Sequence, residues 1–348
     1  MIMEVEVSSK FKLEKAICNH GFFMMAPNTW YPSTKTFVRP LRLINNNTVT
    51  VSIAQPRPSF ISISILDDLH PMSISDHQQH IMDQVKRMLR LSKEDEETVE
   101  AFHKLHSDAA DKAFGRLFRN PSLFEDIVKT FLLCASRFED SLGRAEKLCN
   151  LNPERKRGRR KKAQVNFPTA HEVLSFGMNK LERTLGYRCD VIFDLATDVV
   201  SGRVDLDRWD NSITDGDELY KELIHRKGIG NFVASNILMC IGFYQRVPLD
   251  SETTRHIKQV HHHYGVNKVT DEMVKDIYDK YAPFQTLAYW FELLEYYESK
   301  VGKLYLLEKA DYRNVTGSLI EKRSTFNFNN SSCHLILSLL FDLTSHQY

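Results

Sequence analysis

Residues 221–256 contain the side chains whose types and spacing most clearly indicate chemistry. Two apolar, helix-like segments are joined by Gly228-Ile229-Gly230, and Asp250 follows twenty residues after Gly230. Glycine lets the backbone turn sharply and approach a phosphate closely, while the free N–H groups at the start of the next helix point at that anion. Helix, glycine turn and helix therefore predict a clamp that holds DNA phosphates without reading the base sequence.

The residues beside the glycine turn suit contact with phosphate, since Arg226 and Lys227 could add positive charge. A lone Gly-x-Gly is more often only a helix C-cap and turn. The aspartate one helix length downstream strengthens the DNA-binding interpretation. The contacts predicted for this hairpin come from Lys227, Gly228, Ile229, Gly230 and Asn231.

Asp250 opens the next predicted helix, and two interpretations of it are compatible. As an N-cap it would accept a hydrogen bond from the first turn, and the positive end of the helix dipole would keep it ionised. As a catalyst, a fixed carboxylate would stabilise the positive charge that develops on a sugar during glycosidic cleavage. It could also orient or deprotonate the attacking water.

The elements that must position these residues are of two kinds, which predict an α+β fold. Residues 1–75 carry short runs of β-branched and aromatic residues, namely FVRPLRLI, TVTVSIA and SFISISIL, separated by breaks at INNN and QPRP. We expect an antiparallel β-sheet domain here, covered on one face by a helix. Residues 76–312 are mostly α-helical in their periodicity and form the second predicted domain.

Within the second domain, individual helices are predicted from about residue 122 onward, with the hairpin at 217–243. The first begins after Asn120-Pro121-Ser122, a plausible start signal, and carries an apolar stripe through LFEDIVKTFLLC. The further predicted helices are 139–150, 178–202, 217–226, 231–243, 251–263, 270–281 and 284–299.

Two stretches do not fit either domain. Residues 152–164 hold seven basic residues within 155–162, so we expect a flexible basic insertion that serves as a nuclear localisation signal or a nonspecific DNA tether. Residues 313–348 do not continue the helical pattern and are treated as a tail whose structure the sequence does not predict.

Composition narrows the class of protein. The chain is 42% hydrophobic and 26% charged with a net charge of +1, which is typical of a globular protein whose nucleic-acid face, if any, is a local patch. Its six cysteines show no zinc or iron–sulfur spacing and are expected to be free thiols in a reducing compartment. We expect neither a secretory signal nor a membrane span, because the apolar runs of both are missing.

Two motifs together carry a family resemblance. RKGIG at 226–230 and VPLD at 247–250 resemble the helix-hairpin-helix/Gly-Pro-Asp (HhH-GPD) DNA glycosylase superfamily, in which an L-P-G-V-G hairpin precedes a catalytic V-P-x-D. Lys227 replaces the usual proline. The wider match, from about 120 to 312, is similar to plant DNA glycosylase superfamily proteins, and the N-terminal sheet is similar in kind to those of the 8-oxoguanine and 3-methyladenine branches. The resemblance implies base-excision repair with Asp250 as the catalytic carboxylate.

Two departures change what the resemblance implies. Bifunctional members carry a Schiff-base lysine two residues after the second hairpin glycine, where this chain has Phe232, so a monofunctional enzyme is implied. The 8-oxoguanine branch uses asparagines to contact the orphaned cytosine, and those positions align here with Ala135, Ser136 and Arg137. A preference for cytosine in the opposite strand is therefore weakened.

A third motif, LGYR at 185–188, is similar to the L-G-Y-R-A segment of glycosylases that flip their base. Tyr187 would fill the hole left by the extruded nucleotide, and Arg188 would address the opposite strand. The alternative is that Tyr187 only packs on a neighbouring helix.

A flipped base also needs an aromatic wall, because stacking contributes about 1–3 kcal/mol per base. Trp290 and Phe232 are the predicted base-pocket residues, and Trp30 from the sheet domain is a third candidate. Core packing is the more common role of an aromatic residue at helical spacing, so it remains the alternative for each.

Histidines follow Asp250 without a sequence partner that would make them a metal site. No nearby acid or cysteine completes a ligand set, so we expect a solvated helix end, with a phosphate contact by Arg255 or His256 as the alternative. No metal or cofactor is expected for the chemical step, although the resemblance implies a structural K⁺ or Na⁺ ion on backbone carbonyls of the hairpin. The histidines concerned are His256, His261, His262 and His263.

The sequence thus predicts a monofunctional DNA glycosylase that hydrolyses the N-glycosidic bond of an alkylated or oxidised base. Its partner would be double-stranded DNA with a flipped damaged base, and it would act as a monomer in the nucleus, without AP-lyase activity. One alternative is a catalytically silent, glycosylase-like DNA-binding protein. Another is a helical interaction module, which would show no salt-dependent DNA binding. The identity of the base is not predicted.

Overall fold

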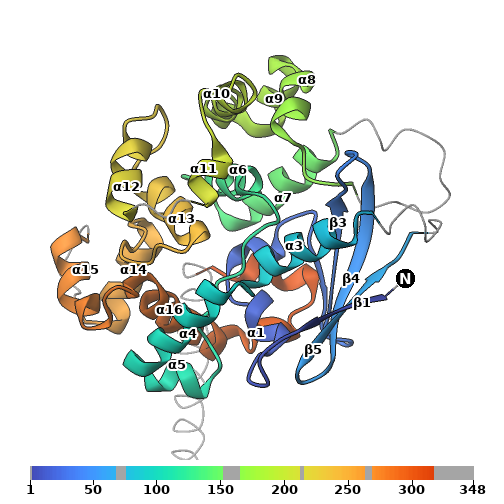
Figure 1. The fold of residues 1–348 in the computed structure, drawn as a ribbon. Coiled ribbons are helices and arrows are strands. Elements are labelled where there is room, and N and C mark those ends of the chain that lie inside the picture. Colours follow the sequence, from blue (N-terminus) through green and yellow to red (C-terminus); the bar gives the residue numbers. More distant parts are fainter. Residues whose placement is uncertain (1, 68–75, 152–164, 212–214, 263–268, 317–348) are drawn as a thin grey trace, which may run out of the picture.

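An antiparallel sheet and a larger group of helices make up the molecule (Figure 1). Within the described residues the sheet precedes most of the helices in the chain, so the α+β composition expected from the sequence is present. The predicted basic insertion and most of the predicted tail lie outside the described residues. The structure is a computed structural model that describes residues 2–67, 76–151, 165–211, 215–262 and 269–316.

The described sheet has five strands in the spatial order β1-β5-β4-β3-β2, and every neighbouring pair is antiparallel. Val49, Val51 and Ile53 of β4 alternate onto the buried face, as side chains two residues apart must. The sequence predicts β3, β4 and β5, whereas β1 and β2 are edge strands that it did not predict. The strands are β1 (Ile2–Glu6), β2 (Thr29–Tyr31), β3 (Thr36–Arg42), β4 (Thr48–Arg57) and β5 (Phe60–Ile65).

A helix covers the buried face of the sheet. α3 (Gln78–Leu89) contacts β1 and β3 and buries Ile81, Val85 and Met88. The short α1 (Leu13–Ile17) packs against α3. Buried residues of the sheet and of the helices form one contiguous hydrophobic cluster, so the sheet shares a core with the helical part.

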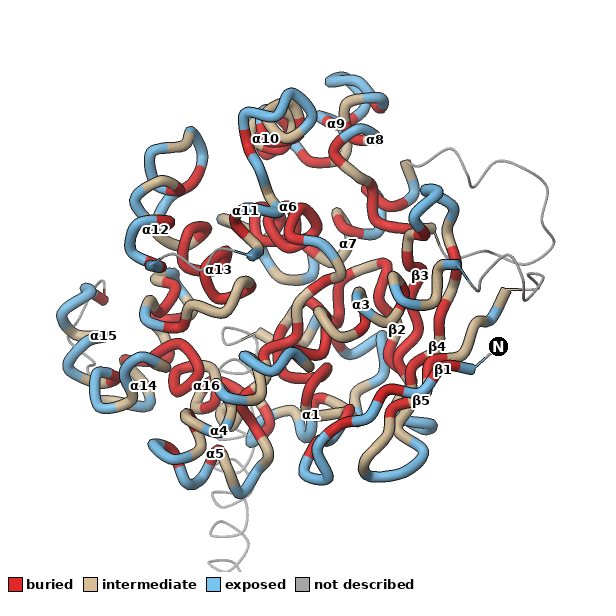
Figure 2. The backbone as a smooth tube through the Cα atoms, in the orientation of Figure 1, coloured by how far each residue is buried: buried red, intermediate tan, exposed pale blue. Residues whose placement is uncertain are grey.

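The helical part surrounds α6 (Leu123–Leu133), whose residues 123–132 are all buried (Figure 2). Its first turn is capped as predicted, because the Ser122 hydroxyl accepts a hydrogen bond from the Glu125 N–H at 3.3 Å. The other helices are α4 (Lys93–Leu105), α5 (Ser107–Asp111), α7 (Phe138–Cys149), α8 (Ala170–Phe176), α9 (Met178–Leu185), α10 (Cys189–Val200), α11 (Leu206–Asp210), α12 (Gly216–Ile224), α13 (Asn231–Ile241), α14 (Ser251–Val260), α15 (Asp271–Tyr278) and α16 (Gln285–Val301).

One predicted helix is interrupted. The sequence predicts a single helix over 178–202, but α9 ends at Leu185 and α10 begins at Cys189. Gly186 has a φ of +61°, a left-handed conformation that ends the first helix. The 3₁₀ turn Gly186–Arg188 between the two helices therefore exposes the residue that follows Gly186.

The end of the described chain returns to the sheet region through two short 3₁₀ helices, η5 (Leu304–Leu306) and η6 (Lys309–Asn314). The Trp30 indole N–H donates to the carbonyl of Tyr305 at 2.8 Å, and the ring of Tyr312 packs edge-on against Phe23 at 5.5 Å. The polypeptide thereby closes around the end of α16 and forms one wall of the cavity described below.

Two simple properties follow from the described residues. No described helix is both long and apolar enough to cross a membrane. The five described cysteines all carry free thiols, which agrees with the expectation from their spacing, and Cys333 lies outside the described residues.

Candidate active site

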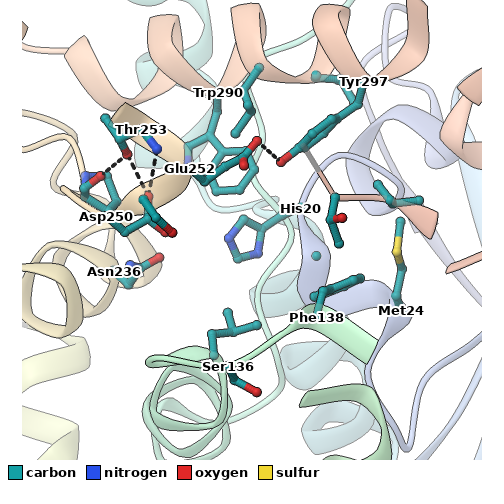
Figure 3. A pocket seen from close by; sticks show the side chains of 18 of the residues that line it. His20, Met24, Ser136, Phe138, Asn236, Asp250, Glu252, Thr253, Trp290 and Tyr297 are labelled. Carbon is teal, nitrogen blue, oxygen red and sulfur yellow. Dashed lines mark hydrogen bonds between the residues drawn. The ribbon is translucent and has the colours of Figure 1, made fainter. Parts of the chain in front are cut away.

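A cavity of about 730 Å³ lies where the N-terminal segment meets the helical part. Its lining residues come from segments far apart in the chain (Figure 3). Such a concave, largely apolar space with a few polar side chains is the usual form of a small-molecule site. The contributing segments are 19–24, 133–139, Phe232 and Asn236 of α13, 248–253, 289–297 of α16, Leu304, and 313–316.

Asp250 lies in this cavity at the N-terminus of α14. Its Oδ1 accepts hydrogen bonds from the N–H of Thr253 at 2.8 Å and from the Thr253 hydroxyl at 3.0 Å. The Thr253 hydroxyl also lies 3.0 Å from the Tyr289 hydroxyl of α16, so two helices fix this corner. The predicted N-cap is therefore present, and the same carboxylate remains open to the cavity (Figure 3).

From the sequence, the helix dipole was expected to keep Asp250 ionised and so to favour a low pKa. In the structure the pKa of Asp250 is raised instead. The hydrogen bonds from Thr253 favour the charged form, but protein atoms packed around this side chain reduce the hydration of its carboxylate, even though the residue is open to the cavity. This desolvation is the larger effect and raises the pKa of Asp250 above its ordinary value. Asp250 is thus a better proton acceptor than an ordinary surface aspartate.

Other polar groups in the cavity are already engaged by neighbours. Glu252 accepts from the Tyr297 hydroxyl at 2.5 Å and from the Arg255 guanidinium through the same Oε1. The Asn236 amide N–H donates to the carbonyl of Phe232 at 2.8 Å, which leaves its oxygen toward Asp250 in Figure 3. These contacts orient the side chains around the aspartate.

The predicted hairpin is formed by α12 and α13, which contact each other. Lys227 is exposed and makes a surface ion pair with Asp194 at 3.1 Å, a weak interaction that a phosphate could replace. Asn231 begins α13 and accepts a hydrogen bond from the Ser235 hydroxyl at 3.1 Å. The side chain of Ile229 is buried in the core, so a DNA contact by this residue is limited to its backbone.

The two hairpin positions are glycines for different physical reasons. Gly228 has a φ of +83°, and a Cβ there would lie 2.5 Å from Val191 of α10. From the sequence, Gly228 was expected to let the backbone come close to a phosphate. In the structure, Gly228 instead lets the backbone come close to α10 of the protein itself. Gly230 caps α13 and would meet no atom with an added Cβ, so this glycine leaves open space before the helix N-terminus.

Tyr187 and Arg188 have separate roles in the structure. Tyr187 is 66% exposed, and its hydroxyl donates to the carbonyl of Cys134 at 3.0 Å. Arg188 is only 3% exposed and donates to carbonyls at the end of α6, including that of Phe131 at 3.1 Å. The prediction that Arg188 addresses the opposite DNA strand conflicts with this burial, because its guanidinium is used to hold the chain after α6.

Two of the three candidate base-stacking residues lie in the cavity. Trp290 and Phe232 line it and are each partly accessible. Trp30 is 2% exposed and does not line the cavity, because its indole anchors the chain at Tyr305. Trp30 is thus a structural residue, which corrects its candidacy for the base pocket.

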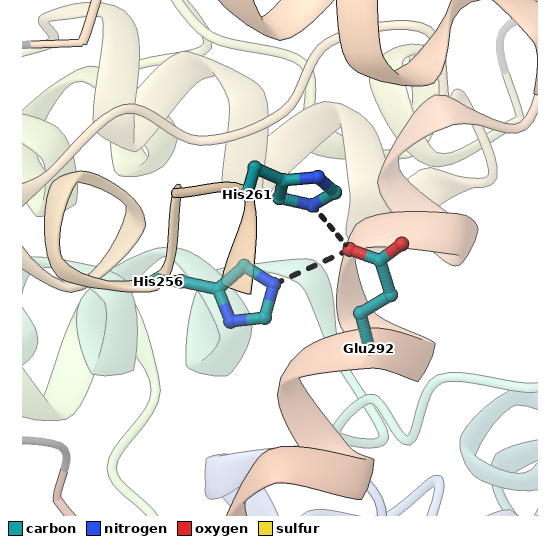
Figure 4. Close-up of side chains that lie close together, drawn as sticks. All are labelled: His256, His261 and Glu292. Atoms are coloured by element: carbon teal, nitrogen blue, oxygen red, sulfur yellow. Dashed lines mark hydrogen bonds and ion pairs between the residues drawn. The ribbon is translucent and has the colours of Figure 1, made fainter. Parts of the chain in front are cut away.

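Of the described histidines after Asp250, His262 is exposed as expected for a solvated helix end, whereas His256 and His261 are not simply solvated. His256 is fully buried, and both it and His261 face Glu292 of α16, at Nε2–Oε2 distances of 3.4 and 2.9 Å (Figure 4). The Tyr278 hydroxyl donates to the same Glu292 oxygen at 2.7 Å. The acidic partner that the sequence did not reveal is therefore supplied by a distant helix.

These three groups have ligand atoms within 4.8 Å of one another, so His256, His261 and Glu292 are the described residues that could hold a metal ion. Burial opposes the charge on Glu292, but hydrogen bonds from both histidines and Tyr278 outweigh it and lower its pKa well below the ordinary range. His263 lies outside the described residues. The hydrogen bonds alone account for this arrangement, which lies outside the residues that line the cavity.

Several cavity residues have no signal in the sequence. His20 and Met24 come from the N-terminal segment, and Asn236, Glu252 and Tyr297 come from three different helices. Their spacing in the chain matches no motif, because the fold alone brings them together. Glu252 and Asn236 could have been suspected only from their nearness in sequence to Asp250 and to the hairpin.

Comparison with solved structures gives several DNA glycosylases at low sequence identity. The 3-methyladenine DNA glycosylase from Archaeoglobus fulgidus matches with a TM-score of 0.65 at 16% identity, over 86% of this chain and 100% of that chain. The 8-oxoguanine glycosylase/lyase from Clostridium acetobutylicum in its apo form matches with a TM-score of 0.59 at 17% identity, over 84% and 97% of the two chains. The same enzyme in complex with double-stranded DNA gives 0.58 at 17% identity, over 85% and 98%. No family model matches the chain, and no curated protein does.

The chain therefore has the fold of the 3-methyladenine and 8-oxoguanine DNA glycosylases. The resemblance carried by RKGIG and VPLD is confirmed at the level of fold by these matches, which extend over most of the chain.

Proposed function

We propose that this chain is a DNA glycosylase of base-excision repair that removes an alkylated or oxidised base without cleaving the DNA backbone. The observation that carries the proposal is the position of Asp250. Its carboxylate is fixed by Thr253, is open to a cavity, and follows directly after the hairpin of α12 and α13 that is predicted to bind phosphates. The glycosylase fold supports the same activity.

The chemistry assigned to Asp250 is hydrolysis of an N-glycosidic bond. Positive charge develops on the sugar as the base departs, and a nearby carboxylate stabilises it. The raised pKa of Asp250 also suits it to accept a proton from an attacking water. Water is the proposed nucleophile because none of the described residues that line the cavity is a lysine. Phe232 is the hairpin residue that occupies the position of the family's lysine.

DNA is proposed to bind across the hairpin and the exposed Tyr187. Gly230, Asn231 and the exposed Lys227 present N–H groups and positive charge to a phosphate. Tyr187 is exposed enough to enter a duplex and fill the space of a flipped nucleotide. The base would then enter the cavity and stack on Trp290 or Phe232.

Three further features stay predictions under this proposal. Monomeric action and a nuclear location rest on the sequence. A K⁺ or Na⁺ ion at the hairpin is compatible with the turn between α12 and α13, because its backbone carbonyls are the donor type that such ions take. The catalytic step proposed for Asp250 uses no metal.

A panel of duplexes tests the function. Each carries one alkylated, oxidised or deaminated base, and release of the free base is measured by chromatography under single-turnover conditions. We expect release of at least one alkylated or oxidised base and none from undamaged DNA. Salt-dependent duplex binding without release of any base would instead support the catalytically silent alternative, and no duplex binding would support the interaction module.

Borohydride separates the two kinds of glycosylase. A Schiff base between a lysine and the sugar is trapped as a stable adduct by this reductant. We expect no trapped adduct with any duplex from which the enzyme releases a base, since water is the proposed nucleophile. The bifunctional Clostridium acetobutylicum enzyme is the positive control, and a robust adduct with this chain would contradict the monofunctional proposal.

A further inference from the structure

His20 is a buried histidine that forms part of the cavity wall. It lies just before the 3₁₀ helix η1 (Gly21–Met24), and its ring packs edge-on against Phe22 at 4.4 Å and Trp290 at 4.6 Å. The residue is only 3% exposed. Figure 3 shows the imidazole projecting between Asp250 and Asn236 on one side and Phe138 on the other.

The polar atoms of this wall have no partner in the protein. Among the described residues that line the cavity, the buried side-chain nitrogens without a hydrogen bond are His20 Nδ1 and Trp290 Nε1. They belong to two rings in direct contact. Leaving a buried donor or acceptor unpaired costs about 1–3 kcal/mol, so two such atoms on one wall require an explanation.

The charge state of His20 defines what it can bind. Burial, with a smaller effect of the Arg90 charge, lowers the pKa of His20 to about 3. The ring is therefore neutral near pH 7 and has one N–H donor and one acceptor nitrogen. A half-turn of the ring about its Cβ–Cγ bond exchanges the buried Nδ1 with a carbon while almost preserving its outline. Either nitrogen can thus be offered to a ligand in the cavity.

Two neighbouring carboxylate oxygens are already engaged. Asp250 Oδ1 is held by Thr253, and Glu252 Oε1 is held by Tyr297 and Arg255. The carboxylates supply acceptors only, whereas neutral His20 has both a donor and an acceptor nitrogen. The edge of the His20 ring is therefore complementary to the edge of a planar heterocycle that carries a hydrogen-bonding atom.

We propose that His20 forms the edge-reading wall of the base pocket and selects the damaged base by hydrogen bonds, while Trp290 and Phe232 keep the stacking role. This inference rests on the proposed function, since it assigns the selective group of the same site. His20 contacts the base, while Asp250 acts at the sugar. The ligand class is a damaged nucleobase with a carbonyl oxygen or an unprotonated ring nitrogen on its exposed edge.

Lesion selectivity in a protein that cannot turn over tests this inference separately from catalysis. The Asp250→Asn protein is titrated with each lesion duplex and with undamaged duplex, with and without His20→Phe. Phenylalanine keeps the ring contacts with Phe22 and Trp290 but has no polar atom. We expect His20→Phe to lower the preference for the best lesion by roughly 10- to 100-fold, with unchanged affinity for undamaged DNA. His20→Asn places a polar group near Nδ1 and His20→Gln places one near Nε2, so one of the two is expected to restore part of the preference.

The control is His106→Phe, which changes another buried histidine that is packed on aromatic rings but does not line the cavity. It is expected to change the melting temperature and not the lesion preference. If His20→Phe fails to fold, the comparison of His20→Asn with His20→Gln decides, and equal loss in both overturns the inference. It is also overturned if His20→Phe keeps the preference, if it weakens all duplexes equally, or if the Asp250→Asn protein prefers no lesion.

The two proposals can fail independently. A lesion preference that depends on His20, together with wild-type protein that releases no base, would refute the glycosylase activity and support the reading wall. Base release whose lesion selectivity is unchanged by substitution of His20 would support the glycosylase activity and refute the reading wall.

Discussion

Two regions of this molecule bury polar side chains, and they differ in how completely those side chains are paired. The first, which we call the ionic cluster, consists of Arg39 of β3 with Glu125 and Lys129 of α6, joined by Asn28 and Asn120. The second is the cavity wall, where Asp250 faces open space and His20 and Trp290 have unpaired nitrogens. Both occur in the same contiguous core.

In the ionic cluster each charge has a partner inside the protein. Arg39 donates to Glu125 at 3.0 Å and to Asn28 at 2.9 Å, and Lys129 lies 2.8 Å from Glu125. Burial would raise the pKa of Glu125, but the two cations outweigh it and lower the pKa. Fully paired polar groups fix the position of the sheet against α6. The unpaired groups at the cavity keep their hydrogen-bonding capacity for a ligand. From this comparison we predict that substitutions in the first region change mainly stability and substitutions in the second change mainly activity.

The largest expected effect is the loss of activity in Asp250→Asn. Asparagine caps a helix as well as aspartate does, so the fold and duplex binding are expected to survive. The stabilising charge is removed, and base release should fall by about 100- to 1,000-fold. Single-turnover release and duplex titration measure the two properties side by side, and a fully active Asp250→Asn protein would contradict the catalytic assignment.

Arg39→Met, in the ionic cluster, should lower stability and leave the activity of the folded protein unchanged. Removing one partner of a buried pair leaves an under-compensated charge and costs about 3–5 kcal/mol of unfolding free energy. Lys129 still neutralises part of the Glu125 charge, so we expect the lower end of this range. The measurement is denaturant unfolding, with base release per folded molecule as the control. If that specific activity fell as sharply as stability, the two regions would not be separable.

The smallest expected effect is a difference in pH dependence between the two carboxylates. The pKa of Asp250 is raised, so its ionised form costs stability at neutral pH, and this cost is relieved as the pH falls through the raised pKa. The pKa of Glu125 is lowered, so its ionised form contributes stability above the unfolded pKa, and this is lost as the pH falls through the lowered one. Relative to wild type, Asp250→Asn should be slightly more stable at pH 7 and Glu125→Gln less stable.

Unfolding free energies measured from pH 8 down to the acid transition test this contrast. Both differences from wild type should shrink toward acid pH, because the wild-type carboxylates become protonated there. The magnitude for Asp250 is expected to be smaller than the effect of Arg39→Met. If Asp250→Asn and Glu125→Gln both changed the unfolding free energy in the same direction, Asp250 would be paired in the folded protein as Glu125 is.

Much of the local structure could be predicted from the sequence. The three central strands have β-branched alternation, and most helices have an apolar stripe together with a capping residue such as Ser122 or Asp250. β1 and β2 were missed because a five-residue and a three-residue edge strand contain too few alternations to stand out. The break at Gly186 was missed because the apolar period continues across it, while the backbone takes a left-handed turn.

The site was predictable only where its residues are close in sequence. The hairpin glycines, Phe232 and Asp250 lie within one window, so spacing alone was informative. His20, Glu292 and the partners of Arg188 lie many residues away from the groups they meet. No periodicity records such a contact, and this is why Arg188, Trp30 and His256 were assigned roles that their burial contradicts.

The sequence by itself determined that two helices joined by a glycine turn precede a carboxylate that caps the next helix, because backbone preferences and capping act over a few residues. Only the tertiary structure decided what faces that carboxylate. The cavity joins the N-terminal segment to α13, α14 and α16, and it brings His20 and Trp290, each with an unpaired nitrogen, into the same wall. Burial and pairing of polar groups depend on which distant segments pack together, and that is set by the shared core.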